Sequence, residues 1–154
     1  NSIVRFLYYP VRVTYAGRLD KDSRGLLLMT NNGDIIDRMM RGANRHEKEY
    51  KVTVDKEITE EFLKKMSEGV PILDTVTRPC RVSRIGKYTF SIVLTQGLNR
   101  QIRRMCEALG YEVKDLVRVR VMNIRLGSLK EGQYRKLSDE ELEELYDLLN
   151  KGGR

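Results

Sequence analysis

The most regular alternation of apolar and polar residues in the chain runs from Glu49 to Asp55. It places Tyr50, Val52 and Val54 on one face of a predicted strand, as expected where one side of a sheet is buried. Further strands are predicted at Arg81 to Ile85 and Tyr88 to Thr95, which flank a Gly86-Lys87 turn and suggest a hairpin, and at Leu116 to Leu126.

The last of these predicted strands breaks its own alternation. Its apolar residues occupy odd positions through Val121 and even positions from Met122. A bulge or bend at this point would restore one buried face, so we predict a single irregular strand over 116–126.

Four segments have the apolar spacing of amphipathic helices. They are Asp34 to Arg41, Thr59 to Glu68 with Thr59 as N-cap, Asn99 to Leu109 ending at Gly110, and 138–149 with Ser138 as N-cap. The apolar stripe of the third helix comprises Ile102, Met105, Cys106 and Leu109. Helices and strands in this mixed order predict an α+β domain.

Charge changes this picture, because it is unevenly distributed. The 154 residues carry a net charge of +7, yet the segment 138–149 holds six acids and no base, which leaves 29 bases against 16 acids, or +13, on the rest. Such an excess is typical of a polyanion-binding surface, although many basic domains never meet nucleic acid.

Length and composition limit the class of protein further. At 154 residues the chain is long enough for one domain, residues 1–154. Its 40% of apolar residues can form a hydrophobic core. No apolar run approaches the roughly 20 residues that cross a bilayer. Cys80 and Cys106 fall in no metal-ligand spacing, which favours a reducing cytoplasm.

Acids and bases alternate in the segment Gly17-Arg18-Leu19-Asp20-Lys21-Asp22-Ser23-Arg24-Gly25-Leu26. A solvated turn would explain such a loop. However, the apolar run from Leu26 to Met29 would anchor it to the core and hold an Asp rigidly. A carboxylate among fixed basic neighbours stays ionised, as a nucleophile must.

Lys48-Glu49-Tyr50 opens the alternating strand. Tyr50 is either an ordinary core tyrosine or a ring that stacks on a base while its hydroxyl reaches the sugar. Lys48 would sit beside the same face.

A basic helix follows the segment Gln96-Gly97-Leu98. On a helical wheel, Arg100 and Arg104 project away from the apolar stripe. Arg103 lies at the edge of the stripe, where it can reach inward. Solvation of an exposed surface would account for all three arginines. The neutral Asn99 and Gln101 beside them, and a helix N-terminus that attracts phosphate, favour RNA.

Together these three segments resemble the RsuA/RluB/RluE/RluF family of bacterial ribosomal RNA pseudouridine synthases, with the RluF branch the nearest. The resemblance covers nearly the whole chain. It implies a pseudouridine synthase fold, with a mixed, largely antiparallel sheet, flanking helices and a central catalytic cleft. It also implies Asp20 as nucleophile, Tyr50 stacked on the target base and Arg103 paired with the aspartate. The implied substrate contacts are Arg18, Lys48, Asn99, Arg100, Gln101 and Arg104, with Leu116 and Arg118 from a looser match.

The implied reaction is isomerisation of a specific uridine to pseudouridine in structured RNA, with a 23S ribosomal RNA hairpin as the expected partner. No cofactor, metal or membrane is expected, and the protein is expected to be a monomer. Family members usually have an N-terminal S4-type domain and an opening catalytic strand containing Lys-Pro and Gly. Neither precedes Asn1, so the chain is interpreted as the catalytic domain of something longer.

Two other functions stay open at this point. A non-catalytic RNA-binding module with the same fold would bind RNA and modify nothing. A glycosidase-like enzyme would use Asp20 with Asp22, but adjacent carboxylates in a turn do not provide an opposed acid and base.

Overall fold

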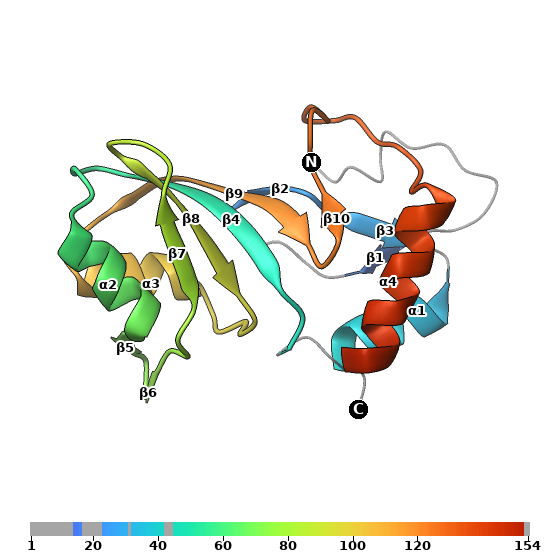
Figure 1. Cartoon of the computed structure of the whole chain (residues 1–154), viewed down its shortest axis with the longest axis horizontal. Coiled ribbons are helices and arrows are strands. Elements are labelled where there is room, and N and C mark those ends of the chain that lie inside the picture. Colours follow the sequence, from blue (N-terminus) through green and yellow to red (C-terminus); the bar gives the residue numbers. More distant parts are fainter. Residues whose placement is uncertain (1–13, 17–22, 31, 42–44, 153–154) are drawn as a thin grey trace.

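The computed structural model describes residues 14–16, 23–30, 32–41 and 45–152 of the chain (Figure 1). Its elements, in chain order, are β1 (Thr14–Ala16), β2 (Arg24–Gly25), β3 (Leu28–Thr30), α1 (Gly33–Arg41), β4 (Lys48–Val54), α2 (Glu60–Glu68), β5 (Pro71–Ile72), β6 (Thr75–Val76), β7 (Arg81–Arg84), β8 (Thr89–Leu94), α3 (Gln101–Ala108), β9 (Val113–Val121), β10 (Ile124–Arg125) and α4 (Asp139–Gly152). The four helices predicted from apolar spacing are therefore confirmed.

A six-stranded sheet organises the described part of the molecule, with the order β10-β9-β4-β8-β7 and β2 added along the edge of β9. The β2–β9 pair is parallel and the other pairs in this sheet are antiparallel. The predicted α+β fold with a mixed, largely antiparallel sheet is thus confirmed. The central catalytic cleft stays a prediction.

The larger hydrophobic cluster lies on one face of β4 and β8. Strand β4 buries the face that its predicted alternation indicates, and β8 shows the same alternating burial. Val52 of β4 and Phe90 of β8 are fully buried there, with Met66 of α2 and Met105 of α3 above them. Figure 1 shows α2 and α3 beside this half of the sheet. We call these fifteen buried residues, with their partly buried neighbours, the first cluster.

A second cluster of eight buried residues joins α1 and α4 to the far end of β9 and to β10. Helix α4 closes it with Leu145 and Leu149. The helix begins with a reciprocal cap, because the amide of Glu141 donates to Ser138 Oγ (3.1 Å) and the amide of Ser138 donates to Glu141 Oε1 (2.9 Å). The predicted N-cap is therefore confirmed.

The prediction of one strand over 116–126 is wrong. Strand β9 already begins at Val113, and the chain reverses at Met122 and Asn123 so that β10 pairs antiparallel with the end of β9. Met122 has a φ of 54° in this turn. The change from odd to even apolar positions therefore marks a reversal of the chain, which a pattern of polarity alone does not distinguish from a bulge.

Helix α3 begins two residues later than its predicted first residue, Asn99. Arg100 precedes it with a left-handed φ of 48°, a conformation that a right-handed helix excludes. No helix in the described part of the chain is both long and apolar enough to cross a bilayer.

Candidate active site

Tyr50 lies on the central strand β4, with a strand on each side. Its Cα partner is Arg118 on β9 and Ile92 on β8. Tyr50 is half-buried against the first cluster, and Lys48 lies on the same face of β4 because alternate residues of a strand share a face. Burial lowers the pKa of the Lys48 ammonium, and the nearby guanidinium of Arg118 lowers it further. Two cations thus lie close to one another beside the tyrosine, and an anion placed there would be stabilised.

The segment that follows the predicted nucleophile is attached to the edge of β9 away from β4, level with this tyrosine. Arg24 and Gly25 pair in parallel with Val117 and Arg118. Arg24 also forms a bidentate ion pair with Asp115, with Nε to Oδ1 at 3.1 Å and Nη2 to Oδ2 at 2.9 Å. This ion pair holds the pKa of the Asp115 carboxyl below its usual range, and its hydrogen bonds from Arg24 are the main cause. Short strand β2 is therefore fixed by its backbone and by a side chain.

Gly25 allows the close approach of β2 to β9. Its φ is 122°, and a Cβ at this position would lie 2.3 Å from the carbonyl oxygen of Arg118. Only a glycine fits this backbone geometry and this contact without displacing a strand. Position 25 of this motif therefore requires glycine both for its positive φ and for its close packing against β9.

Asp20 and Arg18 lie outside the described residues. Ser23, the first described residue after them, is partly buried. The expected anchoring of the segment by its apolar run is confirmed at Leu26, which is buried in the second cluster, and at Leu28, which packs against it. The anchor thus begins six positions after Asp20 in the sequence.

Helix α3 covers the same face of the sheet that carries Tyr50, because Ile102, Met105 and Cys106 are buried in the first cluster. Arg103 is partly buried at the edge of this stripe, as the helical wheel predicted. The structure therefore brings Arg103 and Tyr50 to one side of the sheet.

The predicted RNA contacts at the start of α3 also bind one another. Arg104 donates from Nε to the carbonyl oxygen of Asn99 (3.0 Å) and from Nη2 to its Oδ1 (2.9 Å). Gln101 is 4% exposed, and its Oε1 accepts from the amide of Leu98 (3.2 Å). Arg100 is partly buried. These bonds order the loop before α3, and contact with RNA stays a prediction for all four residues.

Sequence reasoning missed an ionic network on the opposite face of β4. Arg120 of β9 is 9% exposed and donates to Glu49 Oε1 (2.9 Å), Glu47 Oε1 (3.1 Å) and the carbonyl oxygen of Met122 (2.6 Å). Burial raises the pKa of the Glu49 carboxyl, but hydrogen bonds from Arg120 and Ser91 outweigh it and leave that pKa lowered. The network joins β9 to Glu47 and Glu49 on the face of the sheet away from Tyr50. The pairing of Arg120 with Glu49 follows from the register of β4 against β9, and the sequence alone does not reveal that register.

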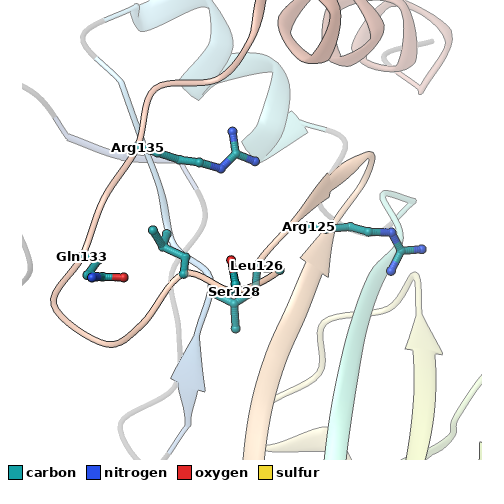
Figure 2. A pocket seen from close by; sticks show the side chains of 7 residues that line it. Arg125, Leu126, Ser128, Gln133 and Arg135 are labelled. Carbon is teal, nitrogen blue, oxygen red and sulfur yellow. The ribbon is translucent and has the colours of Figure 1, made fainter.

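A separate hollow of about 360 Å³ lies in the loop between β10 and α4 (Figure 2). It is lined by Arg125, Leu126, Gly127, Ser128, Leu129, Gln133 and Arg135. Arg135 is already held by Glu141, at 2.7 and 2.8 Å, and Figure 2 shows the Arg125 side chain extending away from the loop. No predicted site residue lines this hollow, so we do not take it as the candidate site.

The described residues contain no group of three or more His, Cys, Asp or Glu side chains that could hold a metal ion. The groups described around Tyr50 are its aromatic ring, its phenol hydroxyl and the cations Lys48 and Arg118. Such a set suits a flat, polyanionic ligand, whose ring can stack and whose phosphates the cations attract.

Comparisons with known proteins identify the class to which this fold and site belong. The family model described as RNA pseudouridylate synthase matches residues 6–108. The chain therefore belongs to the RNA pseudouridylate synthase family, and the resemblance drawn from its three motifs is confirmed.

Individual relatives narrow the comparison. Dual-specificity RNA pseudouridine synthase RluF of Escherichia coli strain K12 is 54% identical over 149 residues, which cover 97% of this chain and 51% of that protein. Ribosomal large subunit pseudouridine synthase E of Vibrio parahaemolyticus is 34% identical, covering 84% of this chain and 63% of its own. A crystal structure of a pseudouridylate synthase matches with a TM-score of 0.86 at 32% identity, over 94% of this chain and 65% of that one. The chain spans about half the length of the RluF relatives that it matches.

Proposed function

We propose that the protein is an RNA pseudouridine synthase, an isomerase that converts a specific uridine to pseudouridine in structured RNA. We propose a hairpin of 23S ribosomal RNA as its substrate. The observation that supports this most is the parallel pairing of Arg24 and Gly25 with β9, opposite Tyr50. It holds residues 24 and 25, the described end of the motif that contains Asp20, across β9 from the motif that contains the tyrosine.

The reaction rearranges one nucleotide without loss of atoms. The bond between N1 and C1′ breaks, the uracil turns, a bond from C5 to C1′ forms, and the proton on C5 is lost while N1 gains one. The departing uracil carries its own negative charge, so the protein supplies a nucleophile, confinement and electrostatics. Asp20 either attacks C1′ or assists elimination across C1′ and C2′, in which case Tyr50 helps to remove the C2′ proton.

Every predicted site residue except Arg118 has a place in this proposal. Tyr50 stacks on the uracil, and Arg103 pairs with the carboxylate of Asp20. The cationic residues Arg18, Lys48, Arg100 and Arg104, with Asn99, contact RNA phosphates and sugars. Gln101 and Leu116 are the remaining predicted substrate contacts. They are 4% and 5% exposed; Gln101 also accepts from the amide of Leu98, and Leu116 lies opposite Val52 on β9.

The target uridine must leave its stack before it can react, which costs a few kcal/mol. A stacked tyrosine and several phosphate contacts offset that cost. We further propose that residues 1–154 form the catalytic domain of a longer protein, which acts as a monomer in the cytoplasm.

The test is substitution of the proposed nucleophile in the full-length protein. Pseudouridine is first mapped across total RNA from cells with and without the gene, and the responsive hairpin is then converted in vitro. We expect Asp20→Ala to bind this hairpin with an unchanged dissociation constant and to form no pseudouridine. Asp74→Ala, in the exposed turn of the β5–β6 hairpin, is the control and should convert normally.

Two results would contradict the proposal in different ways. Normal conversion by Asp20→Ala would show that another group is the nucleophile. A wild-type protein that binds RNA with a steep salt dependence, yet converts no uridine in any RNA, would be a binding module instead.

A further inference from the structure

We propose that Arg118 is a positioning residue for this reaction, which acts by anchoring the backbone of Leu26 and not by touching RNA. The inference rests on the proposed function. It assigns to Arg118 a role different from the substrate contact that sequence resemblance implies.

The burial and the geometry of Arg118 support this role. The residue is 2% exposed, which leaves little surface for a phosphate. The guanidinium donates from Nε (3.0 Å) and from Nη2 (2.8 Å) to the same carbonyl oxygen, that of Leu26. In return the amide of Leu26 donates to the carbonyl oxygen of Arg118 at 2.8 Å. Both backbone polar groups of Leu26 are thus held by one residue of β9.

The rest of Leu26 is fixed as well. Its side chain is buried in the second cluster, at 7% exposed. Gly25 just before it touches the backbone of Arg118, and Arg24 is paired with Asp115. Residues 24–26 therefore have a set position and a set direction relative to Tyr50, which lies across β9 from them.

This matters because catalysis by a positioned carboxylate is sensitive to small displacements. Leu26 lies six positions after Asp20, so the strand that Arg118 holds is the downstream attachment of the segment that bears the nucleophile. A misplacement of about 1 Å of a reacting group can cost about 100-fold in rate. A guanidinium that locks one end of that segment would therefore change the rate of the chemical step without changing the affinity for RNA.

The test compares Arg118→Met, which keeps the bulk and removes all donors, with Arg118→Lys, which keeps one cationic donor. In the full-length protein we would measure the dissociation constant for the hairpin and its salt dependence. We would also measure the single-turnover rate at saturating RNA, and amide hydrogen exchange in a peptide covering residues 23–30. Arg120→Met is the matched control, because Arg120 is a buried arginine of the same strand that binds Glu47 and Glu49 on the other face.

For Arg118→Met we expect a loss of about 100-fold in single-turnover rate, with the dissociation constant and the salt slope unchanged. Exchange in the 23–30 peptide should become faster while exchange in β8 does not. Arg118→Lys should recover part of the rate. Arg120→Met should lower the thermal midpoint but leave the rate and the 23–30 exchange near wild type.

A direct role in RNA binding predicts a different pattern. If Arg118→Met weakens binding, lowers the salt slope by about one and converts at the normal rate once saturated, the residue is an RNA contact and the proposal is overturned. Unchanged exchange in the 23–30 peptide of Arg118→Met would also overturn the proposal, because the hydrogen bonds from Arg118 would then not be needed to hold Leu26. The exchange measurement needs no conversion of uridine, so it separates failure of this inference from failure of the proposed function.

Discussion

Substitution of Gly25 by alanine tests the close contact between β2 and β9. The new Cβ would lie 2.3 Å from the carbonyl oxygen and 2.6 Å from the amide nitrogen of Arg118, whereas ordinary contact starts at 3.4 Å. Both neighbours are backbone atoms, so no side chain can rotate out of the way. Strand β2 would have to retreat from β9 by about 1 Å.

The expected cost follows from this geometry. A φ of 122° is strained for any residue other than glycine, at about 1 to 3 kcal/mol. The retreat also weakens the hydrogen bond from the Leu26 amide to Arg118, worth about 1 kcal/mol, and the bonds from the Arg118 guanidinium to the Leu26 carbonyl. We expect a loss of about 3 to 5 kcal/mol in the free energy of unfolding, or local detachment of β2 where that costs less.

The assay combines urea unfolding with uridine conversion by the same protein sample. Gly33→Ala is the control, because a Cβ at Gly33 meets no atom within 4 Å and alanine is the better helix former at the start of α1. It should be neutral or stabilising by up to about 1 kcal/mol. A Gly25→Ala protein with the wild-type urea midpoint and the wild-type rate would refute the reasoning about this contact.

Two further predictions concern ionisation. Hydrogen bonds from Arg135, with help from the Ser138 amide, lower the pKa of the Glu141 carboxyl to about 2, so its contribution to stability is complete above roughly pH 4.3 and is lost as the pH falls through 2. The stability difference between wild type and Glu141→Gln, from urea unfolding, should therefore shrink over that range, and a constant difference would contradict it. Burial raises the pKa of the Cys106 thiol to about 12 and that of Cys80 to about 11, so iodoacetamide at pH 8 should label Cys106 only after unfolding and Cys80 slowly. Mass spectrometry of the native protein reports both, and labelling of native Cys106 at the unfolded rate would argue against the burial that the structure gives it.

Local signals in the sequence were sufficient for the helices and for the central strand. The Thr59 hydroxyl caps α2 by accepting from the amide of Phe62 (3.0 Å), and Ser138 caps α4, because an N-cap depends only on residues within one turn. The alternation from Tyr50 to Val54 likewise reports burial directly, since period two needs no knowledge of the partner strand.

Long-range pairing could not be predicted in the same way. Arg118 and Leu26 are 92 positions apart, and neither segment indicates that the guanidinium of Arg118 binds the carbonyl oxygen of Leu26. The short strand β2 has only two residues, which is too few for a periodic signal. The turn at Met122 produces the same change of polarity as the predicted bulge or bend, so the sequence pattern does not distinguish them. The resemblance added the candidate site residues, not the contacts that hold them.

Strand β9 has a further consequence for how the molecule unfolds. It contributes Val113 and Leu116 to the first cluster and Val121 to the second, with Arg118 between them. Regions with separate packing open with separate free energies, and the smaller of the two has fewer buried side chains to lose. Sub-global opening of the α1 and α4 region would release Leu26 from its packing while the β4–β8 ladder stays closed. The proposed activity would then be lost at a lower temperature than the one at which the first cluster melts.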